Sequence, residues 1–166
     1  MIRPLGLALL LLAAAAAAGA GPGGAYLPAF GNERIRVRAP GVRPATLFAN
    51  LRFDFDGAPG DPGGTGTVTA LDAEGQDVLS AFPCTWTAGR GNAFTLDPDP
   101  QGLADLLAEG IESFAGGPAV VTLETVAGKG TLRAEGTDLL VRLKAAGSVT
   151  IAGGPPRRFR ASFRLG

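Results

Sequence analysis

Hydrophobic and polar residues alternate along much of the chain, which is the pattern of β-strands with one buried face. The clearest run closes the sequence, and its hydrophobic positions are Phe159, Ala161, Phe163 and Leu165. Glycine, proline and charged turns separate the runs. Strands are therefore predicted at about 34–38, 46–55, 66–72, 77–82, 84–87, 93–96, 120–126, 131–134, 139–144, 149–151 and 158–165.

One stretch has helical spacing instead. Its hydrophobic residues are Leu103, Leu106, Leu107, Ile111 and Phe114. Asp99 suits the N-cap, Pro100 the first helical position and Gly116 the end, so a helix is predicted between them. Gly102 and Gly110 weaken this helix, and we expect packing against the sheet to stabilise it.

The segments 64–96 and 128–163 resemble each other. GTVTA and EGQDVLSAF in the first correspond to GTLRA and EGTDLLVRL in the second, and TWTAG corresponds to VTIAG. Each segment reads as short strands joined by glycine turns, which indicates a possible internal duplication. Chance matching is the alternative, because the chain contains 26 glycines.

These elements predict an all-β fold, an antiparallel β-meander barrel or sandwich of about 8–10 short strands with one helix packed against it. Trp86 stands mid-domain in Thr85-Trp86-Thr87. The strand count resembles that of lipocalin-like barrels, but the Gly-x-Trp motif of that family has no counterpart near the first strand. The resemblance therefore implies no binding residues.

The first residues predict export from the cytoplasm. Residues 1–20 combine Arg3, an apolar run and the small residues Ala18-Gly19-Ala20, as secretory signal peptides do, so we expect cleavage after Ala20. A retained membrane anchor is the alternative, although the apolar run is short for a span. Residues 21–32 are then a flexible linker and 33–166 a single β-rich domain, and the expected location is secreted or periplasmic.

Composition excludes several chemistries. The chain of 166 residues has 15 Lys and Arg against 15 Asp and Glu, so no overall charge directs it to nucleic acid. It has no histidine, which excludes Ser-His-Asp triads, Cys-His pairs and histidine-ligated metals. We therefore expect a non-enzymatic protein without a cofactor. Cys84, which has no cysteine to pair with, is predicted to be a small buried hydrophobe.

Asp54, Asp56 and Asp61 form the densest group of carboxylates. They could converge on calcium, but Pro59 replaces the glycine of a calcium loop and no glutamate closes the site. Solvent-facing strand and turn positions are the favoured interpretation.

Arginine and lysine gather near both ends of the domain. If the first and last strands are neighbours, their outward side chains form one basic face that could hold an anionic glycan, lipid headgroup or protein. The candidate contacts are Arg36, Arg38, Arg158, Arg160, Arg164 and Trp86. The alternative is that the arginines pair with outward acids such as Asp54, Asp56 and Glu124.

The leading functional hypothesis is a secreted or periplasmic non-enzymatic protein that binds either a small apolar ligand inside or an anionic envelope component outside. One alternative is a structural surface-matrix protein without a small ligand. Another is a small outer-membrane barrel with Phe159, Phe163 and Leu165 towards lipid. This alternative is not favoured, because most of the predicted strands are shorter than the roughly nine to eleven residues that a span needs.

Overall fold

The computed structural model describes residues 21–26, 34–38, 45–47, 50–58, 60–72, 75–132 and 139–165, and the predicted leader lies outside this part of the chain. The described residues form ten strands and one helix, which confirms the prediction of an all-β fold with one helix. The strands are β1 (Gly24–Tyr26), β2 (Arg34–Arg38), β3 (Ala45–Leu47), β4 (Asn50–Phe55), β5 (Gly63–Leu71), β6 (Val78–Ala88), β7 (Ala93–Pro98), β8 (Ala119–Leu132), β9 (Leu139–Ile151) and β10 (Arg157–Leu165), and the helix is α1 (Pro100–Ala115).

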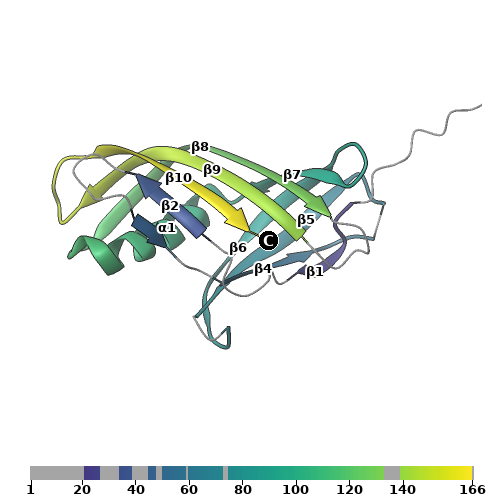
Figure 1. The fold of residues 1–166 in the computed structure, drawn as a ribbon, viewed down its shortest axis with the longest axis horizontal. Coiled ribbons are helices and arrows are strands. Elements are labelled where there is room, and N and C mark those ends of the chain that lie inside the picture. The colour runs from purple at the N-terminus through teal and green to yellow at the C-terminus, as the bar shows by residue number, and fades with distance from the viewer. Residues whose placement is uncertain are drawn as a thin grey trace, which may run out of the picture.

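The strands form one antiparallel sheet in the order β1-β4-β5-β6-β7-β8-β9-β10-β2-β3. From β4 to β10 this order follows the sequence, whereas β2 and β3 join the far side of β10. β3 and β4 thus belong to opposite ends of the sheet, although only residues 48 and 49 separate them. Because the step from Leu47 to Asn50 spans at most about 11 Å, the sheet must curl until its ends approach each other. The result is the barrel-like arch of Figure 1.

Most of the described hydrophobic residues of the strands face the inside of the curl and form one core, whereas Val78, Leu79 and Val120 are exposed. Five phenylalanines of the strands are buried in this core, namely Phe53, Phe55, Phe94, Phe159 and Phe163. The rings of Phe53 and Phe55 stack with centroids 5.9 Å apart, and Phe94 meets Phe55 edge-on at 5.6 Å. Full burial of one such side chain stabilises the fold by about 1.5–3 kcal/mol, so these rings are a major source of stability.

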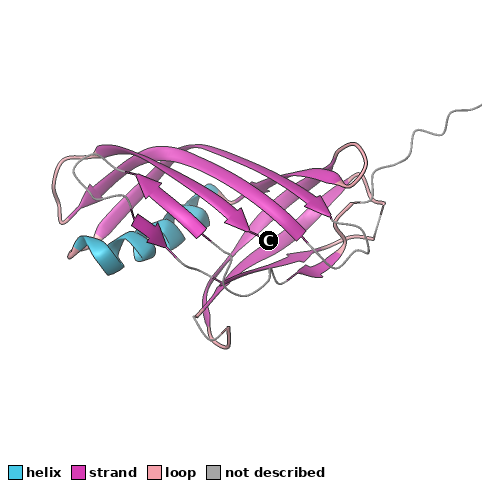
Figure 2. Ribbon diagram, viewed as in Figure 1, coloured by secondary structure: helices cyan, strands magenta, loops and turns pink. Residues whose placement is uncertain are grey.

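α1 covers one end of the curl, where it packs against β8 and β6 (Figure 2). The Asp99 carboxylate accepts a hydrogen bond of 2.8 Å from the Gly102 N–H, Pro100 opens the helix and Gly116 follows it with φ 73°, all as predicted. Phe114, predicted on the buried stripe, is 37% exposed instead. No helix in the described part of the chain is long and apolar enough to cross a membrane.

Three strands are longer than the sequence pattern predicted. Each joins two predicted strands: β6 (Val78–Ala88) joins those at 77–82 and 84–87, β8 (Ala119–Leu132) joins those at 120–126 and 131–134, and β9 (Leu139–Ile151) joins those at 139–144 and 149–151. Residues 133 and 134 lie outside the described part of the chain. Gly130 shows why glycine does not end β8. It lies directly opposite Phe94 of β7, and a side chain at position 130 would overlap the Phe94 ring. This glycine makes room for a cross-strand neighbour instead of forming a turn.

Pro83 lies inside β6 without interrupting it, contrary to the predicted break. Its carbonyl oxygen accepts a hydrogen bond of 2.8 Å from the Asp99 N–H, on the side where β7 lies. The N–H and C=O groups of one strand residue point to the same side, so the N–H that proline lacks would also point there. β7 pairs with β6 only from Cys84 onwards, so the missing donor leaves no ladder bond unmade.

Two boundaries near the N-terminal end also differ from the prediction. Residues 24–26, expected in the flexible linker, form β1 and pair with β4 from Phe53 to Phe55. The predicted strand 46–55 divides into β3 and β4, because its first part pairs with β2 and its second with β5. Alternation alone cannot show such a division, since it does not reveal which strand each part pairs with.

The two similar segments follow the same course. β5, β6 and β7 form one three-stranded meander, and β8, β9 and β10 form another. Gly75 turns the chain between β5 and β6 with φ 70°. The corresponding Glu135-Gly136 turn lies outside the described residues. The shared course accounts for the repeated sequence pattern without deciding between duplication and chance.

The contact between α1 and β6 generates a stability prediction. A methyl group at position 102 would overlap the Phe82 side chain, so Gly102→Ala should destabilise the protein by about 1–3 kcal/mol although alanine favours helix. Phe82→Gly removes the overlapping atoms, including the Cβ, and in that background Gly102→Ala should stabilise the protein by up to about 1 kcal/mol. Urea unfolding of the four proteins of this double-mutant cycle measures the coupling. Additive effects would contradict the close contact.

Candidate anion-binding face

β2 and β10 lie side by side, so the arginine-rich segments from the two ends of the domain meet in one sheet. Arg38 stands directly opposite Arg160, and Arg36 opposite Ser162. Opposite residues of an antiparallel pair share a face. Val37 and Ala161, the alternate residues, are buried in the core, so the arginines face outward. The first and last predicted strands are thus neighbours, and their outward arginines share one face.

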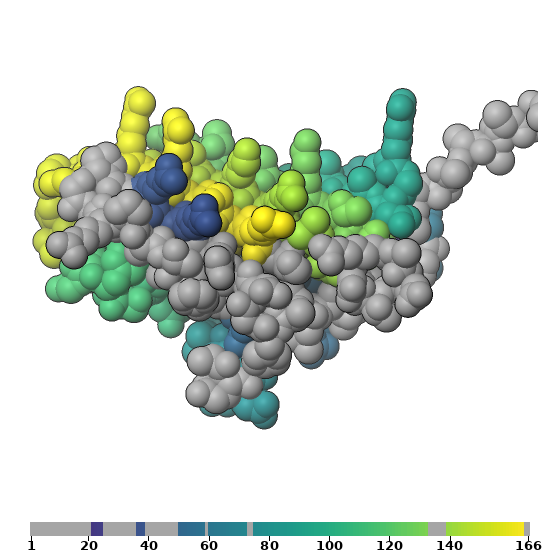
Figure 3. All heavy atoms as spheres, viewed as in Figure 1, coloured from purple at the N-terminus to yellow at the C-terminus, as the bar shows by residue number. Residues whose placement is uncertain are grey.

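The next two strands extend this surface. Lys144 of β9 lies opposite Ser162, Arg142 lies opposite Arg164, and Lys129 of β8 lies opposite Arg142. We call the resulting surface the basic face, and its members are Arg36, Arg38, Lys129, Arg142, Lys144, Arg158, Arg160 and Arg164. All are exposed, and none forms an ion pair with another described residue. Long side chains from this region project along the upper edge of Figure 3.

A shallow hollow of about 530 Å³ lies in the basic face. Its small lining residues, which include Ala127, Ala146 and Ser162, come from three neighbouring strands, β8, β9 and β10. The cations that line the same hollow are Arg36, Arg38, Lys144 and Arg160. Short side chains between long basic ones thus leave a depression with positive charge around it. This is a suitable geometry for one anionic group held by several charge-assisted hydrogen bonds.

The acids proposed as alternative partners of the arginines lie elsewhere or are otherwise engaged. Asp54 pairs with Arg52 of its own strand at 2.9 Å. The Asp56 carboxylate accepts a hydrogen bond of 2.8 Å from the Thr65 hydroxyl, and Asp61 accepts one of 2.7 Å from the Ala58 N–H. These separate partners fit the strand and turn positions favoured over a calcium site. Glu124 of β8 is exposed and makes no ion pair with a described residue.

Trp86 is not brought together with the arginines. It is 1% exposed and lies in the core, on the inner side of the sheet. Its indole N–H is shared between the carbonyl oxygens of Asp56 (3.3 Å) and Thr65 (3.2 Å). Gly64 lies so close that a Cβ there would stand 3.0 Å from the ring. In this structure Trp86 fills space and satisfies two backbone carbonyls.

The arginines and phenylalanines of β10 have the opposite orientation to that required by the outer-membrane alternative. That alternative places Phe159 and Phe163 towards lipid and the arginines inside. In the structure both phenylalanines are 2% exposed and belong to the core. Arg158, Arg160 and Arg164 are exposed on the outer face.

Sequence reasoning missed part of this face. Lys129 was not among the candidates, because it lies between two glycines that indicated a turn. The small residues of the hollow carry no signal of their own, since alanine and serine occur throughout the chain. Their common position becomes visible only when the register of β8, β9 and β10 is known.

Cys84 is a free cysteine buried among core residues, as predicted. Its side chain is 3% exposed and alternates with Trp86 along β6. Burial, and to a lesser extent the negative charge of Asp56, raises the pKa of the Cys84 thiol from 9.0 to about 11. The thiol is therefore a poor nucleophile near neutral pH.

No protein-family model and no curated protein sequence matches the chain. Among solved structures, the chain is similar to the crystal structure of Rv2717c from M. tuberculosis, with 15% sequence identity and a TM-score of 0.30. The similarity covers 87% of this chain and 92% of that chain. No statement about function follows from a similarity at this level.

The buried thiol predicts a pH dependence of stability. The folded state holds the Cys84 proton more tightly than the unfolded state does. The resulting contribution to the free energy of unfolding is therefore fully present below pH 9.0 and is lost as the pH rises towards about 11. Urea unfolding at pH 8 and pH 10.5 should therefore show a larger loss of stability for the natural chain than for Cys84→Ala. Other groups titrate equally in both proteins. A parallel decline would show that burial does not shift this thiol.

Proposed function

We propose that the protein is a secreted or periplasmic, non-enzymatic β-barrel-like protein that binds an anionic polysaccharide of the cell envelope through its basic face. The observation that carries this proposal is the set of exposed cations that four neighbouring strands place together without an acid partner among the described residues. Export is supported by the signal-peptide pattern of residues 1–20. The absence of histidine supports a non-enzymatic role.

The direct opposition of Arg38 and Arg160 supports an anionic ligand. Like charges opposite each other across two strands are unfavourable, and an anion between them removes the repulsion. Arginine is also the side chain best suited to bind carboxylate, sulfate or phosphate, because its planar guanidinium donates two parallel hydrogen bonds. The hollow gives such a group a place between Arg36, Lys144 and the opposed pair.

The shape and composition of the outer surface favour a polymer over a lipid surface. β8, β9 and β10 arch along their length, so this side of the sheet is convex (Figure 1). A flexible chain with repeated charges can follow such a surface, whereas a flat bilayer contacts only its most protruding part. In the described part of the chain the exposed large hydrophobic residues are Val78, Leu79, Phe114 and Val120, and none of them lines the hollow. Membrane binding usually adds apolar contacts to charge attraction.

Charge, and not stacking, is the proposed basis of recognition. The described tryptophan and phenylalanines of the strands are buried in the core, so they are not available to stack on sugar rings from outside. The balanced total charge makes the attraction local to the basic face. Binding should therefore weaken with salt, because ions screen exposed charges beyond about 8 Å at physiological ionic strength.

The proposal predicts binding of dextran sulfate but not of uncharged dextran, measured by isothermal titration calorimetry with the purified chain. Arg160→Glu should weaken binding by about tenfold, because it reverses a charge at the hollow. Arg90→Glu is the matched control. It makes the same charge change at an exposed position between β6 and β7, away from the hollow, and should alter affinity by less than about twofold.

Equal effects of the two substitutions would overturn the assignment of the site, and binding that does not respond to salt would overturn its electrostatic basis. Vesicles that contain phosphatidylglycerol are the competing ligand. Tighter binding to these vesicles than to dextran sulfate would show that the ligand is a lipid surface and not a polysaccharide. Sedimentation of the protein alone would favour the structural-matrix alternative.

A further inference from the structure

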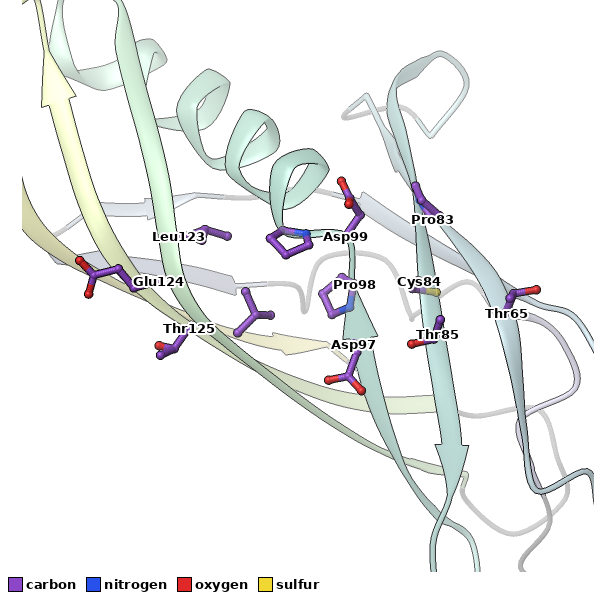
Figure 4. A pocket seen from close by; sticks show the side chains of 12 residues that line it. Thr65, Pro83, Cys84, Thr85, Asp97, Pro98, Asp99, Leu123, Glu124 and Thr125 are labelled. Carbon is purple, nitrogen blue, oxygen red and sulfur yellow. The ribbon is translucent and has the colours of Figure 1, made fainter.

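A groove opens through the sheet where β7 separates from β8. The two strands pair from Ala93 opposite Thr131 to Leu96 opposite Gly128. Beyond this point β7 turns into α1, while β8 continues beside β9. The groove between them has a volume of about 520 Å³, within the range of about 300–1,000 Å³ usual for small-molecule sites (Figure 4).

Proline explains why this part of the sheet does not close. Pro98 and Pro100 stand at the end of β7 and the start of α1, and neither has an N–H to donate to the facing strand. On the other side, the register of β8 shifts between Leu123 and Thr125, which interrupts regular pairing there. The opening is therefore built into the local sequence of both strands.

The lining of the groove is mainly apolar. Pro98 and Cys84 stand opposite each other on the inner face of β7 and β6, and both are buried. From the other side, the half-buried Leu123 of β8 points into the groove (Figure 4), and Val126 completes this wall. A ligand here would contact hydrophobic side chains without displacing the phenylalanine core.

The charges at the groove have one sign. Asp97, Asp99 and Glu124 belong to its lining, and none of the described residues that line it is a lysine or arginine. Asp97 is exposed at the outer end of β7. Asp99 caps α1, so its charge is partly balanced by the helix N-terminus. The groove thus differs in charge from the hollow of the basic face, although Thr125 lines both.

We propose that this groove is a second binding site, specific for a small amphiphile with an apolar chain and a positively charged end. The apolar chain would lie against Leu123, Val126 and Pro98, and the cation would lie near Asp97. An anionic amphiphile would be repelled by the same carboxylates. The site is distinct from the polysaccharide site, because its charge is opposite and Thr125 is the one described residue that lines both.

The test compares three amphiphiles with the same ten-carbon chain, each below its micelle concentration, by isothermal titration calorimetry. Decyltrimethylammonium should bind saturably with one molecule per chain, and decanoate should bind at least about tenfold more weakly to the groove. Decyl maltoside measures the contribution of the apolar chain alone. Asp97→Asn should weaken the binding of decyltrimethylammonium by about three- to fivefold and leave the affinity for decyl maltoside unchanged. Glu109→Gln, on the exposed side of α1, is the charge control.

Leu123→Trp fills the groove and should abolish binding of decyltrimethylammonium. Val120→Trp is its control on the same strand, because Val120 is 65% exposed and does not line the groove. Circular dichroism checks that each variant folds. If Leu123→Trp does not fold, Asp97→Asn still tests the proposal. Equal affinity for cationic and anionic amphiphiles, or binding that survives Leu123→Trp, would overturn the proposal. Dextran sulfate binding should remain in Leu123→Trp, which separates this site from the polysaccharide site.

Discussion

The pairing of β2 with β10 is the constraint on which the rest of the structure depends. It joins the N-terminal part of the domain to its last strand and places Arg38 directly against Arg160. Repulsion between such charges costs about 0.2–1 kcal/mol, which burial of Val37, Ala161 and Phe163 on the opposite face outweighs. A ligand that binds the folded state and neutralises this face would also stabilise it.

Local rules account for the elements that could be predicted. The strict alternation of β10 and the cap, proline and glycine of α1 each specify structure within a few residues. The long strands were harder to predict, because glycine and proline usually end strands and here Gly130 and Pro83 lie inside them. Here the Phe94 ring occupies the space over Gly130. The N–H that Pro83 lacks would point to the side where β7 no longer pairs with β6. Both exceptions depend on a neighbouring strand, which a single sequence does not show.

The candidate site was predictable in its charges but not in its shape. The outward position of Arg36, Arg38 and Arg160 follows from alternation, and their proximity needed only the adjacency of two strands. The hollow needs the register of β8, β9 and β10, because Ala127 and Ala146 matter only through their place between longer side chains. The groove at Pro98 was also invisible, since it arises where two strands stop pairing.

The two surfaces suit different ligands, and both depend on how the sheet is assembled. The central claim is that β2 lies against β10, and spin labels at positions 36 and 162, in a Cys84→Ala background, test it most directly. These residues are cross-strand partners, so their electron paramagnetic resonance spectrum should show strong dipolar broadening. A doubly labelled protein whose spectrum equals the sum of the two singly labelled spectra would contradict the account.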